Sequence, residues 1–174
     1  IEAIKSLRSN YRYGTQAEAL LIMLFTGQRK TRVLHMNISE INLTTKEWYV
    51  PGNEKKREVT HPFNDEAWKI IESRFPLAEK QGGFLFTWRG KPLNDCRKTL
   101  LMACQQCGVT NLTIHDLRRS LGTWMLSSGA SIESVAKTLG NSVEVAQEVY
   151  AHILNSRGRQ DTAAAIAAMK KGEV

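Results

Sequence analysis

The chain has 174 residues, 42% of them hydrophobic, which is enough for one domain with its own core. Lys and Arg number 24 against 17 Asp and Glu, and the net charge of +7 favours a polyanionic partner such as nucleic acid. No apolar run approaches the roughly 20 residues that span a bilayer, and no signal-peptide pattern opens the chain. We therefore expect a soluble cytoplasmic protein without a membrane partner.

Helical spacing is predicted over residues 1–7 and again over 16–25. The second segment is apolar enough to be buried and ends at Thr26-Gly27, where glycine is a natural terminator. Arg29 follows and is expected to begin a short helix. A guanidinium at the mouth of a glycine-containing turn can hold a phosphate through two hydrogen bonds, although an ordinary surface arginine is the alternative.

Residues 40–61 change to a strand period. Trp48 and Val50 alternate with polar neighbours, and Pro51 opens a turn before the pattern resumes at residues 59–61. This predicts a β-hairpin or a three-stranded antiparallel sheet begun near residues 40–43. The tip is basic and contains Lys55, Lys56 and Arg57, which a solvated turn would also explain.

A helix over residues 65–75 is predicted next, capped by Asn64 and followed by a loop over residues 76–83. A short buried segment, residues 83–86, leads to the turn at residues 88–91. That turn is basic because it contains Arg89 and Lys91, so it is either a DNA contact or an ordinary solvated turn.

The three cysteines lie in a predicted helix over residues 94–107. Cys96, Cys104 and Cys107 recur at the spacing of a single helical face, and cysteine is among the most buried residue types. Zinc needs four ligands, and no second pair of ligands lies nearby. We therefore expect reduced core cysteines and no metal.

The segment after residue 112 has the most informative polar pattern. Thr113 and Asp116 form a capping-box pattern that starts a helix just before His115. His115 and Arg118 then lie on one helical face, which Gly122 extends. An imidazole and a guanidinium at a helix start suit a phosphate, although a local cap and a surface salt bridge are the alternative.

The last part of the chain predicts further helices. Ser131 caps a short one that Gly140 ends, and Asn141 with Glu144 forms a capping box that opens the helix with Tyr150. A polar stretch, residues 155–160, is expected to separate this helix from an Ala-rich one over residues 163–169. By itself, Tyr150 is also explained as an amphipathic core residue among neighbouring valines.

Four segments together resemble the catalytic domain of the tyrosine recombinase (phage integrase) family. They are Thr26-Gly27-Gln28-Arg29, Thr113-Ile-His-Asp-Leu-Arg118, Leu139-Gly-Asn-Ser142 and Tyr150-Ala-His152. The resemblance covers residues 26–152, in the order that the family has. It implies an α+β fold that is mostly helical, with a small antiparallel three-stranded sheet. It also implies that residues 1–174 are the catalytic domain, without the family's N-terminal core-DNA-binding domain.

The resemblance implies strand transfer on DNA without a cofactor. Tyr150 would attack a backbone phosphate, giving a 3′-phosphotyrosine and a free 5′-hydroxyl. Arg29 and Arg118 would hold the non-bridging oxygens, and His115 would bind the phosphate or accept the tyrosine proton. Lys55 matches the family's hairpin lysine, with Lys56 as second candidate, and would protonate the leaving oxygen.

Two positions depart from the family pattern. Arg32 stands where an acidic residue usually supports the active site, so either it faces DNA or another carboxylate, such as Glu40, substitutes. Asn141 stands where His or Trp is common. It can donate a hydrogen bond to the phosphate, which would make it a catalytic residue, or it can be only a helix cap.

The partners implied are double-stranded DNA at specific attachment sites, a tetramer on that DNA, and accessory DNA-bending proteins in the bacterial cytosol. The side chains expected at the DNA are Lys56, Arg57, Arg32, Arg119 and Arg89. The function implied is a site-specific recombinase or integrase of a phage or mobile element. The alternatives are a DNA-binding protein that keeps the fold without cutting, or an enzyme like a type IB topoisomerase.

Overall fold

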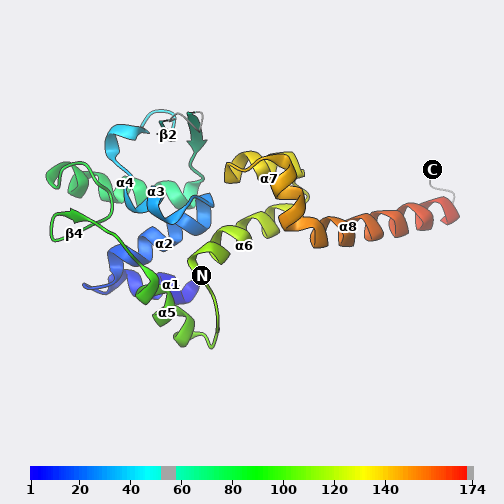
Figure 1. The fold of residues 1–174 in the computed structure, drawn as a ribbon, viewed down its shortest axis with the longest axis horizontal. Coiled ribbons are helices and arrows are strands. Elements are labelled where there is room, and N and C mark those ends of the chain that lie inside the picture. Colours follow the sequence, from blue (N-terminus) through cyan, green and yellow to red (C-terminus); the bar gives the residue numbers. More distant parts are fainter. Residues whose placement is uncertain (52–57, 172–174) are drawn as a thin grey trace. The chain divides into compact units, whose positions relative to one another are not determined.

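A computed structural model describes residues 1–51 and 58–171 (Figure 1). It has two compact units, residues 1–121 and residues 122 onward. The first unit contains α1 (Glu2–Ser6), α2 (Gly14–Thr26), α3 (Lys30–Leu34), β1 (Ile41–Asn42), β2 (Glu47–Val50), β3 (Val59–Pro62), α4 (Asp65–Lys80), β4 (Thr87–Trp88), β5 (Lys91–Pro92) and α5 (Arg97–Gln106), with 3-10 turns at Leu7–Ser9 and Ile38–Glu40. Helix α6 (Ile114–Ser127) crosses the boundary, and α7 (Ile132–Leu139) and α8 (Val143–Lys171) follow. The predicted fold class is confirmed.

Helix α2 is the centre of the first unit. It packs against α1, α3, α4 and α5, and most of its residues are buried (Figure 1). A helix that is apolar on every face is stable in water only when it is covered all round. It ends at Gly27, whose φ of 65° is the left-handed conformation that glycine adopts without strain. The predicted buried helix and its end are confirmed.

The three strands form an antiparallel sheet in the order β1-β2-β3. Trp48 and Val50 are buried and Tyr49 is exposed, as the alternation predicted. The register pairs Trp48 with His61, so this histidine lies opposite the most buried aromatic ring of the sheet. The Trp48 ring stacks parallel to Phe63, with centroids 6.4 Å apart, and thus joins the sheet to the start of α4.

Helix α4 is longer than predicted. Asn64 caps it as expected, because its Oδ1 accepts a hydrogen bond from the Ala67 N–H at 2.9 Å. The helix does not stop at Phe75 but continues through Pro76 to Lys80, so the loop predicted over residues 76–83 is wrong. Proline has a helical φ and lacks only the N–H. Here the side chain at 76 is exposed, so water can bond the carbonyl that its missing N–H leaves without a partner.

A partly buried ion pair joins distant parts of the first unit. The Arg74 guanidinium on α4 donates to Glu18 of α2 at 2.5 Å, to the Leu85 carbonyl at 3.1 Å and to the Thr15 hydroxyl at 3.0 Å. Arg8 donates to the same carboxylate at 3.0 Å. Each donor of Arg74 has a different acceptor, which is the condition under which a charge tolerates burial.

The cysteine helix is shorter than predicted, and this corrects the environment of one cysteine. Helix α5 runs from Arg97 to Gln106, so Cys96 and Cys107 are its two end residues. Cys96 and Cys104 are buried as expected, but Cys107 is exposed. The helical face predicted from the spacing ends with the helix, because the chain leaves helical geometry at Cys107.

We expect only Cys107 of the three thiols to react readily with iodoacetamide in the folded protein. Burial raises the pKa of Cys96 to about 12 and also raises the pKa of Cys104. The thiolate is the reactive form, so both buried cysteines are protected by geometry and by ionisation. Peptide mapping after brief labelling at neutral pH checks this. Labelling of Cys96 as fast as Cys107 would contradict it, and unfolding in denaturant should expose all three.

The second unit is built on α7 and α8, which pack together. Ser131 caps α7 through the Ser134 N–H, and Gly140, with φ of 62°, ends it, both as predicted. Asn141 does not cap α8. Its N–H donates to the Ala136 carbonyl at 2.9 Å and closes α7, while the Ser142 hydroxyl accepts from the Val145 N–H at 3.3 Å.

Helix α8 is continuous from Val143 to Lys171, so the break predicted at residues 155–160 is wrong. Polar residues lower helix propensity only slightly, and Gly158 costs about 1 kcal/mol in a helix interior, which does not suffice to end one. Within residues 1–51 and 58–171, no helix is both long and apolar enough to cross a membrane.

Candidate functional site

The turn after α2 presents Arg29. Gly27 reverses the chain in the left-handed conformation, and the Thr26 hydroxyl holds the turn by accepting from the Gln28 N–H at 3.3 Å. Arg29 follows as the N-terminal cap residue of α3, in extended backbone, with its side chain exposed. A buried glutamine and an exposed arginine therefore alternate, and the guanidinium is available to an external anion.

Helix α6 brings the second arginine to this turn. Thr113 and Asp116 form the predicted capping box, with the carboxylate accepting from the Thr113 N–H at 2.9 Å. His115 is thus in the first turn and exposed, whereas Arg118, one turn later, is only 5% exposed. Arg118 Nη1 donates to the Gly27 carbonyl oxygen at 2.6 Å. This hydrogen bond ties the two arginine motifs together across 91 positions of sequence.

Arg29, His115 and Arg118 border one cavity of about 440 Å³. Its cationic side is formed by these three residues, and its other wall is apolar and includes Leu100 and Ile114. Burial, with the positive charges of nearby arginines, holds the pKa of His115 below its usual value. His115 is therefore neutral at pH 7 and can both donate and accept a hydrogen bond. The arrangement suits a bound phosphate, with two guanidiniums and one neutral imidazole.

His61 on β3 is a site residue that the sequence did not single out. Its Nδ1 lies 3.4 Å from Gln28 Nε2, so it contacts the turn that presents Arg29. Burial lowers its pKa first, and the positive charges of Arg118 and Arg32 lower it further. Neither the strand pattern nor any motif marks His61, because its neighbours are set by sheet register and by the packing of β3 on the turn.

We expect the His61 ring to titrate below pH 6.5. Because its pKa is lowered on folding, the unfolded chain binds the proton first as the pH falls. His61 therefore contributes no loss of stability above about pH 6.5 and an increasing loss below it. Two-dimensional NMR of the ring, assigned with a His61→Gln variant, gives the midpoint. A midpoint above 6.5 would contradict the prediction.

The carboxylate expected to replace the missing acidic residue does not do so. Glu40 Oε2 accepts from the Trp48 indole N–H at 3.0 Å and from the Asn37 N–H at 3.5 Å. The carboxylate is thus part of a capping box beside the sheet. Arg118 instead has a backbone carbonyl as an acceptor, that of Gly27, and a carbonyl can support a guanidinium without neutralising its charge.

Tyr150 lies on α8 in the second unit and is 2% exposed. Two valines of the stripe that might have explained it, Val145 and Val149, are 46% and 38% exposed, whereas Ala146, one turn before the tyrosine, is fully buried. A Cβ atom added to Gly122 of α6 would overlap the Tyr150 hydroxyl and its Cζ. The glycine therefore leaves the space in which the phenol end of Tyr150 lies.

The remaining predicted side chains are distributed over both described and undescribed residues. The three basic residues of the hairpin tip lie outside the described residues: Lys55, Lys56 and Arg57. Arg119 has an exposed side chain 3.7 Å from the Asp116 carboxylate. Arg89 lies in the turn between β4 and β5, and Arg32 is half-buried on α3.

Comparison with known proteins decides the family. The model of the Phage integrase family matches residues 2–157, most of the chain. The chain belongs to the phage integrase family. Its relatives in this family include the tyrosine recombinase XerC of Corynebacterium glutamicum, 29% identical over 146 residues, which are 80% of this chain and 47% of the relative. The tyrosine recombinase XerD of Staphylococcus aureus is 26% identical over 164 residues, 87% of this chain and 54% of the relative.

Solved structures show the phage integrase fold in this chain. A XerH site-specific recombinase bound to palindromic difH substrate has a TM-score of 0.73 and 18% identity, over 95% of this chain and 49% of that one. The catalytic domain of bacteriophage HP1 integrase has a TM-score of 0.60 and 21% identity, over 87% and 84%. The chain spans about half the length of the curated relatives it matches.

Proposed function

We propose that this chain is the catalytic domain of a site-specific DNA recombinase that cleaves and rejoins DNA through a 3′-phosphotyrosine. The observation that carries the proposal is the 2.6 Å hydrogen bond from Arg118 to the Gly27 carbonyl, because it holds both arginine motifs at one cavity. Family membership adds the tyrosine and the order of the motifs. The proposal assigns DNA binding by a further N-terminal domain, and tetramer assembly on DNA, to the whole protein.

The reaction follows from the chemistry of the named groups. The Tyr150 oxygen forms a bond to phosphorus, and the bond from phosphorus to the 5′ oxygen breaks. Arg29 and Arg118 bind the non-bridging oxygens and stabilise the charge that grows there in the transition state. Neutral His115 accepts the phenol proton or hydrogen-bonds the phosphate, and Lys55 protonates the leaving oxygen. Reversal with a different 5′-hydroxyl rejoins the strand.

A nicked duplex provides the test, because loss of the short fragment beyond the nick traps the covalent intermediate. The duplexes are taken from the DNA that flanks the gene, and the full-length protein is used. We expect an adduct that survives denaturation and whose nucleotide maps to Tyr150 by mass spectrometry. Salt-sensitive binding without an adduct would favour the non-cleaving DNA-binding protein. Relaxation of supercoiled plasmid without sequence preference would favour the topoisomerase.

We expect Gly122→Ala to slow adduct formation about tenfold or more, since a small displacement of a reacting group has a large effect on rate. A methyl group at this position overlaps the end of the Tyr150 side chain, so the phenol must move. The matched control is Gly158→Ala on α8, where the added Cβ meets no atom within 4 Å. Both changes favour the helix by about 1 kcal/mol, so only the first should affect the rate. Equal rates in the two variants would contradict the prediction.

A further inference from the structure

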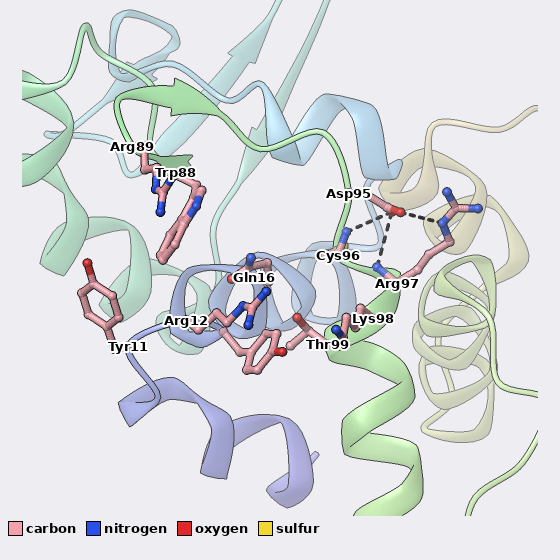
Figure 2. A pocket seen from close by; sticks show the side chains of 11 residues that line it. Tyr11, Arg12, Gln16, Trp88, Arg89, Asp95, Cys96, Arg97, Lys98 and Thr99 are labelled. Atoms are coloured by element: carbon pink, nitrogen blue, oxygen red, sulfur yellow. Dashed lines mark hydrogen bonds and ion pairs between the residues drawn. The ribbon is translucent and has the colours of Figure 1, made fainter.

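A second cavity of the first unit, about 680 Å³, combines cationic and aromatic side chains (Figure 2). It is formed by the turn before α2, the β4–β5 hairpin and the first turn of α5. Four of its side chains are basic: Arg12, Arg89, Arg97 and Lys98. The cavity shares Arg97 with the cavity that Arg29 and Arg118 border.

The charge of this second cavity is not balanced by its own acidic group. Among the described residues that line it, Asp95 is the single acid. Figure 2 shows its carboxylate bonded to Arg97, at 2.7 Å, and to the Cys96 N–H, at 3.0 Å. Asp95 also pairs with Lys30 of α3 at 3.4 Å. Its one negative charge is thus shared by two cations, and the remaining cations favour an anion from outside.

The aromatic wall suits a planar group. Tyr11 is 92% exposed and meets the Trp88 ring edge to face, with centroids 5.7 Å apart. The guanidinium of Arg89 lies 6.0 Å from the centre of the Trp88 ring, and that of Arg12 lies 5.7 Å from the Tyr13 ring. Rings paired with guanidiniums beside a cationic groove are the combination that holds bases and sugars next to phosphates.

The two cavities are continuous in both side chains and secondary structure. Arg97 borders both, and the Lys30–Asp95 pair joins the helix after Arg29 to the start of α5. A polyanion seated on Arg29 and Arg118 therefore reaches the second cavity by passing Arg97. A small isolated anion would need neither this continuity nor the aromatic wall, whereas a nucleic acid strand uses both.

We propose that the second cavity binds DNA beside the cleaved phosphate. Arg12, Arg89 and Lys98 contact its backbone phosphates, and Tyr11 with Trp88 packs on an adjoining sugar or base. The inference rests on the proposed function for the identity of the polyanion. It assigns a binding role to five side chains that no motif of the sequence marks together.

The test measures binding of the protein to a fluorescein-labelled DNA duplex of about 25 base pairs, by anisotropy, between about 50 and 200 mM KCl. Arg12→Gln, Arg89→Gln and Lys98→Gln should each reduce the slope of log affinity against log salt by about 0.9, the value for one lost phosphate contact. The matched control is Lys80→Gln, at the exposed end of α4, with an unchanged slope. Parental slopes in all three cavity variants would overturn the proposal and favour a protein ligand for the cavity.

Tyr11→Ala separates stacking from charge. It should weaken binding about fivefold or more without changing the salt slope, because stacking releases no counterions. Its full exposure makes a folding defect unlikely to mimic the effect, and thermal unfolding of the variant verifies this. Parental affinity in Tyr11→Ala would overturn the aromatic part of the proposal.

The binding test and the adduct test fail separately. An adduct at Tyr150 together with parental slopes would overturn the second DNA site alone. Reduced slopes without any adduct would support the DNA site and overturn the recombinase mechanism.

Discussion

Tyr150→Phe is expected to abolish the covalent adduct while the protein still folds and binds DNA. The change removes only the hydroxyl oxygen that would become bonded to phosphorus, and the ring still fills its buried site. Loss of one hydrogen bond at a buried position lowers the free energy of unfolding by about 1 kcal/mol, which a folded domain tolerates. The measurement is the fraction of nicked duplex in a denaturation-resistant complex.

Tyr49→Phe is the matched control for this experiment. Tyr49 is 46% exposed on β2, and its hydroxyl donates to Glu58 at 2.8 Å. This variant loses the same atom from a tyrosine outside the proposed chemistry, so its adduct yield should equal that of the parent. An adduct at the parental rate in Tyr150→Phe would exclude Tyr150 as the nucleophile.

Arg118→Lys is expected to slow adduct formation by about 10²- to 10³-fold at saturating DNA, the effect of removing one fixed donor to transition-state charge. A lysine ammonium is a point charge without the planar fork that bonds two oxygens at once. The same change removes the guanidinium that bonds the Gly27 carbonyl. Because Arg118 is 5% exposed, we also expect the free energy of unfolding to fall by about 1–3 kcal/mol.

Arg119→Lys tests whether these effects belong to the position and not to the helix. Arg119 is the next residue of α6, but its side chain is 57% exposed beside Asp116. Its substitution should change the free energy of unfolding by no more than about 0.5 kcal/mol, as is usual for surface positions. Its adduct rate at saturating DNA should remain parental. A parental rate in Arg118→Lys would remove this arginine from the mechanism.

Local patterns predicted the parts of the site that depend on neighbours in sequence. The capping box at Thr113 starts α6 so that His115 is in its first turn, and Gly27 ends α2 just before Arg29. Errors arose where a local signal was given too much weight. Pro76 does not end α4, and Asn141 closes α7 while Ser142 caps α8.

The sequence by itself determined the mostly helical fold, the antiparallel sheet, the family and the order of its motifs, because helix caps, strand alternation and motif spacing act over a few residues. Only the tertiary structure decided that Arg118 bonds the Gly27 carbonyl, that His61 lies against Gln28, and that Glu40 serves the sheet. These contacts join residues far apart in the chain, and their partners are set by how helices and strands pack together. Local spacing carries no record of that packing.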